Sequence, residues 1–174
     1  MNRYHNPIYT SILKMMAMVL LLTAGVAWTQ DNPIVIRLEH YIVSVITAED
    51  GSKQERFFES ETARPGEVIE YRLFVSNQGE RTLPAGTVMI TGPIPEGTSF
   101  VDGSATPDSE NVLTEFSADG SSYASPPIII EPEDGAEEER RIVAPEDYQS
   151  VRWTILVPTE PYQEQTFFYR VIVE

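Results

Sequence analysis

The sequence predicts an all-β protein, built as a sandwich or a barrel. Short segments rich in Val, Ile, Tyr and Phe recur along the chain, and several alternate apolar with polar residues, as half-buried strands do. Turn signals containing Gly or Pro separate these segments. No segment keeps an apolar period of 3.6 residues, so long amphipathic helices are not expected.

The expected strands follow from this alternation and from the turn signals between them. Pro65-Gly66 precedes one of the most regular alternations, Asp119-Gly120 predicts a hairpin, and the proline-rich segment 92–97 ends a strand because proline cannot donate to a ladder. Residues 144–148 are expected to form at most a helical turn. The strands are expected at 34–48 (as one or two), 56–62, 67–77, 87–91, 98–101, 113–118, 121–130, 151–157 and 165–173.

The N-terminus has the order of a secretory signal peptide. Arg3 and Lys14 lie in a basic start without acids, an apolar run follows, and small residues precede a polar segment. Cleavage is expected after Ala27, so residues 1–27 are the signal peptide, 28–33 a short lead-in and 34–174 a single domain. An uncleaved membrane anchor is the alternative, although the apolar run is shorter than the roughly 20 residues that span a bilayer.

Composition excludes several classes of function. The 174-residue chain has a formal net charge of -15, which disfavours binding to nucleic acid and to anionic membrane surfaces. It has no cysteine, so disulfides, thiolate metal sites, cysteine nucleophiles and a lipoprotein anchor are excluded. No dinucleotide-binding or P-loop glycine motif is present.

Several segments together resemble a family of bacterial surface proteins. In order they are Ala63–Tyr71 (ARPGEVIEY) followed by Asn77-Gln78-Gly79, then Pro93–Thr98 (PIPEGT), Val101–Ser104 (VDGS), Phe116–Gly120 (FSADG), Val151–Thr154 (VRWT) and Phe168–Val171 (FYRV). This pattern resembles the bacterial conserved repeat domain, known as domain of unknown function number eleven. The resemblance covers roughly residues 34–174, here as a single copy where the family often forms tandem arrays.

The resemblance implies an Ig-like β-sandwich in an extracellular or envelope setting, with no enzyme activity and no catalytic residues. The residues themselves also have structural roles. Pro65-Gly66 suits a tight turn, and Asn77 with Gly79 suits a strand end that needs side-chain hydrogen bonds or a left-handed backbone. Trp153 and Tyr71 are expected to pack between the sheets.

Catalytic chemistry is not expected. His40 is the one histidine after the expected signal peptide; it lies mid-strand beside Glu39, without a nucleophile motif, so it is interpreted as a strand-face residue. A hydrolase that uses paired carboxylates is a third and weak hypothesis, because no sequence feature marks such a pair.

The acidic segment 131–139 is the candidate cation site. Its carboxylates Glu133, Asp134, Glu137 and Glu138 are the weak candidates for calcium ligands, since hard cations prefer clustered oxygen ligands. The spacing does not match an EF-hand, and Arg140-Arg141 follows directly, so a solvated charged loop is the simpler interpretation. No other cofactor is expected.

The leading functional hypothesis is a non-catalytic structural or protein-interaction module of the bacterial cell envelope. It would be secreted to the periplasm or the cell surface, without a stable membrane span after cleavage, as an accessory subunit of a surface layer or another envelope assembly. Its partners would be other envelope or surface proteins, and strand 165–173 is a candidate for docking or for a sheet edge. The alternative is a sandwich that binds carbohydrate or calcium, with Tyr123, Tyr148 and Tyr162 stacking on sugar rings.

Overall fold

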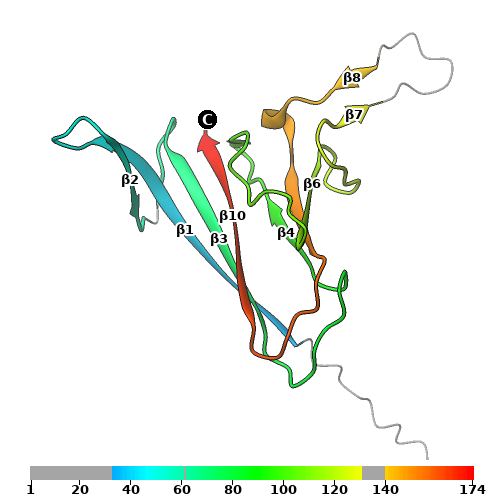
Figure 1. Cartoon of the computed structure of the whole chain (residues 1–174). Helices are drawn as coiled ribbons and strands as arrows, with labels where there is room; N and C mark the ends of the chain where they lie inside the picture. The colour runs from blue at the N-terminus through cyan, green and yellow to red at the C-terminus, as the bar shows by residue number, and fades with distance from the viewer. Residues whose placement is uncertain (1–32, 61, 131–139) are drawn as a thin grey trace, which may run out of the picture. The chain divides into compact units, whose positions relative to one another are not determined.

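The computed structural model describes residues 33–60, 62–130 and 140–174, which all belong to one compact unit, Pro33–Glu174. The described chain is an all-β, antiparallel sandwich (Figure 1). The expected signal peptide and nearly all of the lead-in lie outside the described residues. No helix among the described residues is long and apolar enough to cross a membrane.

The larger sheet has five strands in the order β2-β1-β3-β10-β5. All of its neighbouring strands run antiparallel, and β1 pairs with β3 along the ten residues from Ile34 to Val43. Its strands are β1 (Ile34–Thr47), β2 (Lys53–Phe58), β3 (Val68–Asn77), β5 (Thr98–Phe100) and β10 (Glu164–Val173).

The second sheet has three strands in the order β4-β9-β6, and β7 and β8 form a separate two-stranded ribbon. One turn of 3-10 helix, η1 (Pro145–Asp147), precedes β9, where the sequence predicted a helical turn. The strands are β4 (Met89–Pro93), β6 (Val112–Ser117), β7 (Ile129–Ile130), β8 (Arg141–Ile142) and β9 (Ser150–Ile155).

The core lies between the two sheets and is rich in aromatic rings. Trp153 of β9 is fully buried, and its ring packs against Phe167 and Tyr169 of β10 at centroid distances of 5.4 and 6.0 Å. Tyr71 is half-buried against the core and stacks on Tyr169 at 5.2 Å. The prediction that Trp153 and Tyr71 pack between the sheets is therefore confirmed.

Gly66 and Gly79 are required for different physical reasons. Gly66 has a φ of 86°, the left-handed conformation expected of the Pro65-Gly66 turn. At Gly79 a Cβ would lie 2.8 Å from the Cβ of Pro33, so close approach requires this glycine. Asn77 Oδ1 accepts a hydrogen bond from the Gly79 N–H at 3.0 Å, which confirms the side-chain hydrogen bond expected at this strand end.

Several predicted elements need correction. Within 121–130, the chain pairs with β6 at one bridge, Phe116 with Ala124, and the next strand is the two-residue β7. The strand β4 continues through Gly92 and Pro93, because an edge position tolerates a residue without an N–H. The strand β8 begins at Arg141, which the sequence predicted to be the last residue of a charged loop over residues 131–141.

Candidate functional site: the open edge of the five-stranded sheet

The two sheets differ in width, and this difference leaves part of β1 uncovered. In the antiparallel pairing of β1 with β3, paired residues share a face, so Ile36 and Leu38 lie on the same face as the buried Val75 and Leu73. The three-stranded sheet covers Val75 and Leu73 but leaves Ile36 at 49% and Leu38 at 56% exposure. The core-facing side of β1 is thus half open to solvent.

The first half of β1 is also an open sheet edge. The strand β2 pairs with β1 from Ile42 to Thr47, so no strand of the described residues pairs with residues 34–41 on that side (Figure 1). We call this segment, on the side away from β3, the β1 edge. It combines the outward-pointing backbone groups of Ile36, Leu38 and His40 with apolar side chains on both faces, since Val35 on the opposite face is 50% exposed.

The backbone groups that point outward from the β1 edge can be identified from the register. The Pro33 carbonyl accepts a hydrogen bond from the Gln78 N–H. In this register the backbone N–H and C=O groups of the odd-numbered residues of the segment point toward β3, and those of the even-numbered residues point outward. The backbone groups of Ile36, Leu38 and His40 therefore point away from the sheet. Those groups have no backbone hydrogen-bond partner among the described residues.

A surface pocket lies between the β1 edge and the chain that follows β2. It is lined by Leu38, Glu39, His40, Tyr41, Glu59 and Ser60. His40 is exposed on the strand face, as predicted, and its Nε2 lies 3.0 Å from the Ser60 carbonyl oxygen. Since the His40 side chain is on the core-facing side of the sheet, this contact shows that the chain after Phe58 turns toward that side.

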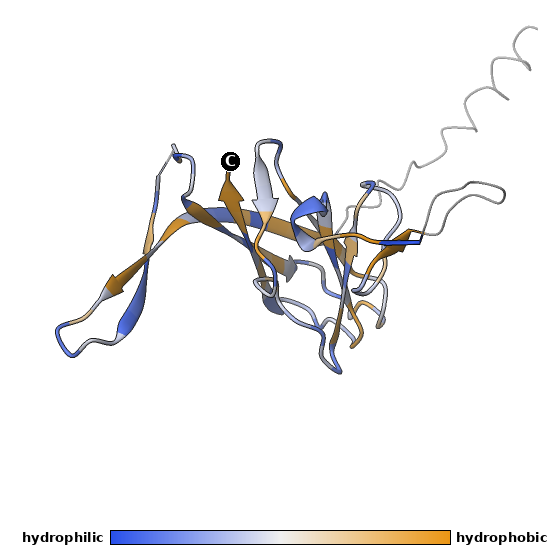
Figure 2. Cartoon of the chain, turned by 90° about the horizontal axis from the view of Figure 1, so that it is seen from above, coloured by the Kyte–Doolittle hydropathy of each residue, from blue (hydrophilic) through white to orange (hydrophobic). Residues whose placement is uncertain are grey.

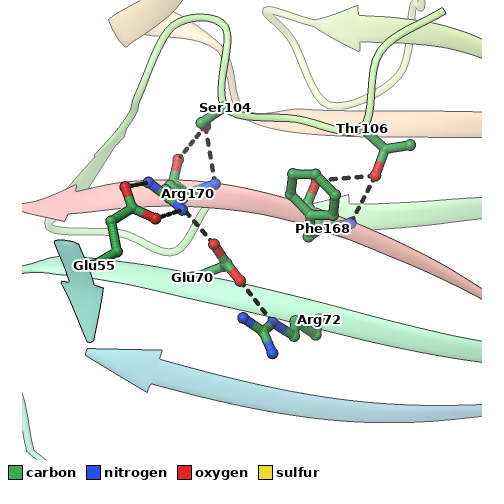
Figure 3. Close-up of polar contacts among 7 residues, drawn as sticks. All are labelled: Glu55, Glu70, Arg72, Ser104, Thr106, Phe168 and Arg170. Atoms are coloured by element: carbon green, nitrogen blue, oxygen red, sulfur yellow. Dashed lines mark hydrogen bonds and ion pairs between the residues drawn. The ribbon is translucent and has the colours of Figure 1, made fainter. Parts of the chain in front are cut away.

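The outer face of the same sheet carries a ladder of ion pairs, shown in Figure 3. Arg170 of β10 binds both carboxylate oxygens of Glu55 at 2.7 Å and donates from Nε to Glu70 at 2.8 Å. Arg72 donates to the other oxygen of Glu70 at 2.6 Å. Because β1 and β3 lie between β2 and β10 in the sheet, the pair of Glu55 with Arg170 shows that the β1–β2 hairpin bends over the outer face.

These contacts set the electrostatics of the ladder. The hydrogen bonds from Arg170 lower the pKa of Glu55, and the bond to Glu55 together with that to Glu70 raises the pKa of Arg170. The Arg72 guanidinium also lies over the rings of Tyr41 and Phe57, at 4.8 and 4.5 Å. The charged groups of the ladder satisfy one another, so we interpret the ladder as structural and not as a ligand site.

Strand β10 is an interior strand of the sheet and not the open edge that the sequence left as one option. It pairs with β3 on one side and with β5 on the other. After β5, the segment 101–106 continues along β10. The Arg170 carbonyl accepts from the Val101 N–H, and the Arg170 N–H donates to the Ser104 hydroxyl. The Phe168 carbonyl accepts from the Thr106 N–H, and the Phe168 N–H donates to the Thr106 hydroxyl (Figure 3).

The three tyrosines suggested for sugar stacking do not form a common surface. Tyr148 is buried and packs against Phe116 at 4.9 Å, so it belongs to the core and not to a surface for sugar stacking. The Tyr123 ring is covered by the Arg152 guanidinium at 4.0 Å, and its hydroxyl contacts Ser150 Oγ at 2.9 Å. Tyr162 is 66% exposed in a loop before β10.

The calcium candidates Glu133, Asp134, Glu137 and Glu138 lie outside the described residues. Among the residues that the structure describes, no group of three or more His, Asp or Glu side chains is arranged to hold a metal ion. The β1 edge was missed by sequence reasoning, although one signal was present. Ile, Val and Leu occupy both faces of residues 34–38, which is typical of a strand buried on both sides.

The comparisons with known proteins add no assignment. The chain matches no family model, no curated protein and no solved structure.

Proposed function

We propose that this protein is a non-catalytic interaction module of the bacterial cell envelope, and that it assembles by pairing its β1 edge with another strand. The observation that carries the proposal is that the outward-pointing backbone groups of Ile36, Leu38 and His40 have no backbone partner within residues 33–60, 62–130 and 140–174, and lie between half-exposed apolar side chains. A strand added to a sheet edge gains main-chain hydrogen bonds, and side chains on alternate positions give selectivity. Soluble proteins usually protect such edges, since an exposed apolar edge promotes association.

The envelope setting rests on the sequence. The signal-peptide pattern of residues 1–27 supports secretion to the periplasm or the cell surface, and the resemblance to the conserved repeat domain supports an Ig-like module of surface proteins. In this setting the protein would be an accessory subunit of a surface layer or another envelope assembly. The absence of catalytic motifs in the sequence supports a structural role.

The experiment compares three forms of the protein after gentle extraction of the native envelope and size separation. Leu38→Lys places a charge on the β1 edge, which should prevent strand pairing. Leu156→Lys makes the same chemical change at an apolar residue that is 41% exposed and lies outside β1. Wild type and Leu156→Lys should migrate in a larger assembly, whereas Leu38→Lys should migrate alone. If Leu38→Lys stays in the assembly, or if wild type migrates alone, the proposal is wrong.

A further inference from the structure

We propose that the partner of the β1 edge is an extended segment of another envelope protein, with a basic residue at one end of a run of alternating apolar residues. The apolar side chains would lie beside Ile36 and Leu38, and the basic side chain would enter the pocket that Leu38, Glu59 and Ser60 help to line. This inference rests on the proposed function and names the chemistry of its partner.

The pocket lies at the end of the open part of β1. From Ile42 onward, β2 occupies this side of the strand. If β2 continued in the same register, Ser60 would lie opposite His40, but the chain turns toward the core-facing side, where the Ser60 carbonyl oxygen lies 3.0 Å from His40 Nε2. A strand that pairs with the outward groups of Ile36 and Leu38 therefore reaches the pocket, and its residue beside His40 can place a side chain there.

The side chains beside the open backbone favour a partner that is apolar on one face. Ile36 and Leu38 lie on the core-facing side of the sheet and are 49% and 56% exposed. The partner residues opposite them present their side chains on the same face, so apolar residues there would cover both. The partner residue between them lies on the outer face, beside the exposed Arg37, where a polar residue fits. The expected pattern is therefore apolar, polar, apolar.

The pocket is acidic, and one of its carboxylates is free to bind a cationic group. Its described lining residues include Glu39 and Glu59 and no Lys or Arg, and its volume of about 420 Å³ suits one long side chain. Glu39 already accepts from Arg37 and from the Tyr41 hydroxyl. Glu59 is exposed and has no hydrogen bond or ion pair within the described part of the chain. A Lys or Arg side chain in the pocket would gain an ion pair with Glu59 and apolar contact with Leu38.

The charge of the whole chain and the register of β1 both favour another protein over a second copy. The net charge is -15, so two copies repel one another, whereas a basic segment is attracted. Two β1 segments also fit poorly. The antiparallel register that places Arg37 opposite Glu39 in both directions would place Ile34 beside Ile42, where β2 is already paired.

The experiment compares two acetylated and amidated peptides, KTVTITK and ETVTITE, as probes of the purified full chain. A basic residue at both ends lets the first peptide reach the pocket in either strand direction. Binding is measured from the shifts of the Ile36 and Leu38 amide signals in NMR spectra. KTVTITK should bind about fivefold more tightly than ETVTITE, as expected of a partly exposed ion pair. Glu59→Lys should remove this preference, whereas Glu49→Lys, the same change at an exposed residue of the β1–β2 turn, should keep it.

The inference is overturned if wild type binds the two peptides equally, if it binds neither at millimolar concentration, or if Glu49→Lys removes the preference as Glu59→Lys does. The same two variants extend the envelope extraction: Glu59→Lys should leave the assembly, and Glu49→Lys should stay in it. If Leu38→Lys leaves the assembly but Glu59→Lys stays, the inference of a basic partner fails and the proposed function stands. If Leu38→Lys also stays, both fail.

Discussion

The β10 side and the β1 side of the five-stranded sheet differ in how the outward-pointing backbone groups of these strands are hydrogen-bonded. On the β10 side, hydrogen bonds from β5 and from Val101, Ser104 and Thr106 satisfy the backbone of Phe168 and Arg170. On the β1 side, the backbone groups of Ile36 and Leu38 point outward without such a cover among the described residues. The same sheet thus has a capped side and an open side. We infer that the capped side maintains the fold and that the open side is available for assembly.

The ladder on the outer face links these two sides. It connects β2, next to the open edge, to β10 through Glu55, Arg170 and Glu70. Figure 2 shows that the β1–β2 hairpin reaches away from the second sheet and carries apolar segments. The ladder therefore holds a hairpin that the second sheet does not cover, and it keeps the open edge in one defined position.

The largest effect is expected from removal of Glu70, whose side chain is 5% exposed between two arginines. Glu70→Ala should lower the free energy of unfolding by about 2 kcal/mol, because it leaves two partly buried guanidinium groups without their shared partner. Urea unfolding measures this loss. Glu164→Ala, at an exposed position on the same face, is the matched control and should change stability by less than about 0.5 kcal/mol. An equal effect of both variants would contradict the structural role of the ladder.

A smaller effect is expected when the capped side is opened. Ser104→Ala combined with Thr106→Val removes the hydroxyl acceptors of the Arg170 and Phe168 amides and should cost about 1–2 kcal/mol. Amide exchange at Phe168 and Arg170 should become faster. Thr166→Val, on the same strand but without such a contact among the described residues, is the control. Unchanged exchange in the double variant would show that the hydroxyls do not protect this side.

The pair of Glu55 and Arg170 predicts a modest dependence of stability on pH. Arg170 lowers the pKa of Glu55, so the contribution of the pair is present above the unfolded value of about 4.5 and is lost as pH falls through the folded value. Glu55→Gln should cost under about 1 kcal/mol near neutral pH, because the pair is partly exposed. The difference between wild type and variant in urea unfolding should shrink below pH 4.5. A difference that stays constant down to low pH would argue against this ion pair.

The smallest effect on stability is expected at the open edge. Leu38 is 56% exposed, so Leu38→Lys should change the free energy of unfolding of the isolated chain by less than about 0.5 kcal/mol. The same variant should lose association. A large loss of stability would mean that Leu38 belongs to the core of the single chain, and the comparison between the two sides would then fail.

The period of apolar residues was a good guide to strands but not to their order. The longest strands, β1, β3 and β10, lie within one or two residues of their predicted bounds, since long alternations leave little ambiguity. The segment 121–130 was misjudged because its isoleucines have the composition of a strand, although Pro126 and Pro127 cannot donate to a ladder and only Ile129 and Ile130 find a partner strand. Strand order depends on long-range contacts, so the sequence did not show that β10 is interior or that β1 is open.

Amide exchange measured residue by residue tests most directly whether β1 is open in the single chain and paired after assembly. In the Leu38→Lys chain, Ile36 and His40 should exchange fast, while Arg37 and Glu39, which bond to β3, should be slow. In the assembled wild type, Ile36, Leu38 and His40 should also become slow. If these three amides stay fast after assembly, or if Ile36 and His40 are already slow in the single chain, the β1 edge is not the assembly surface.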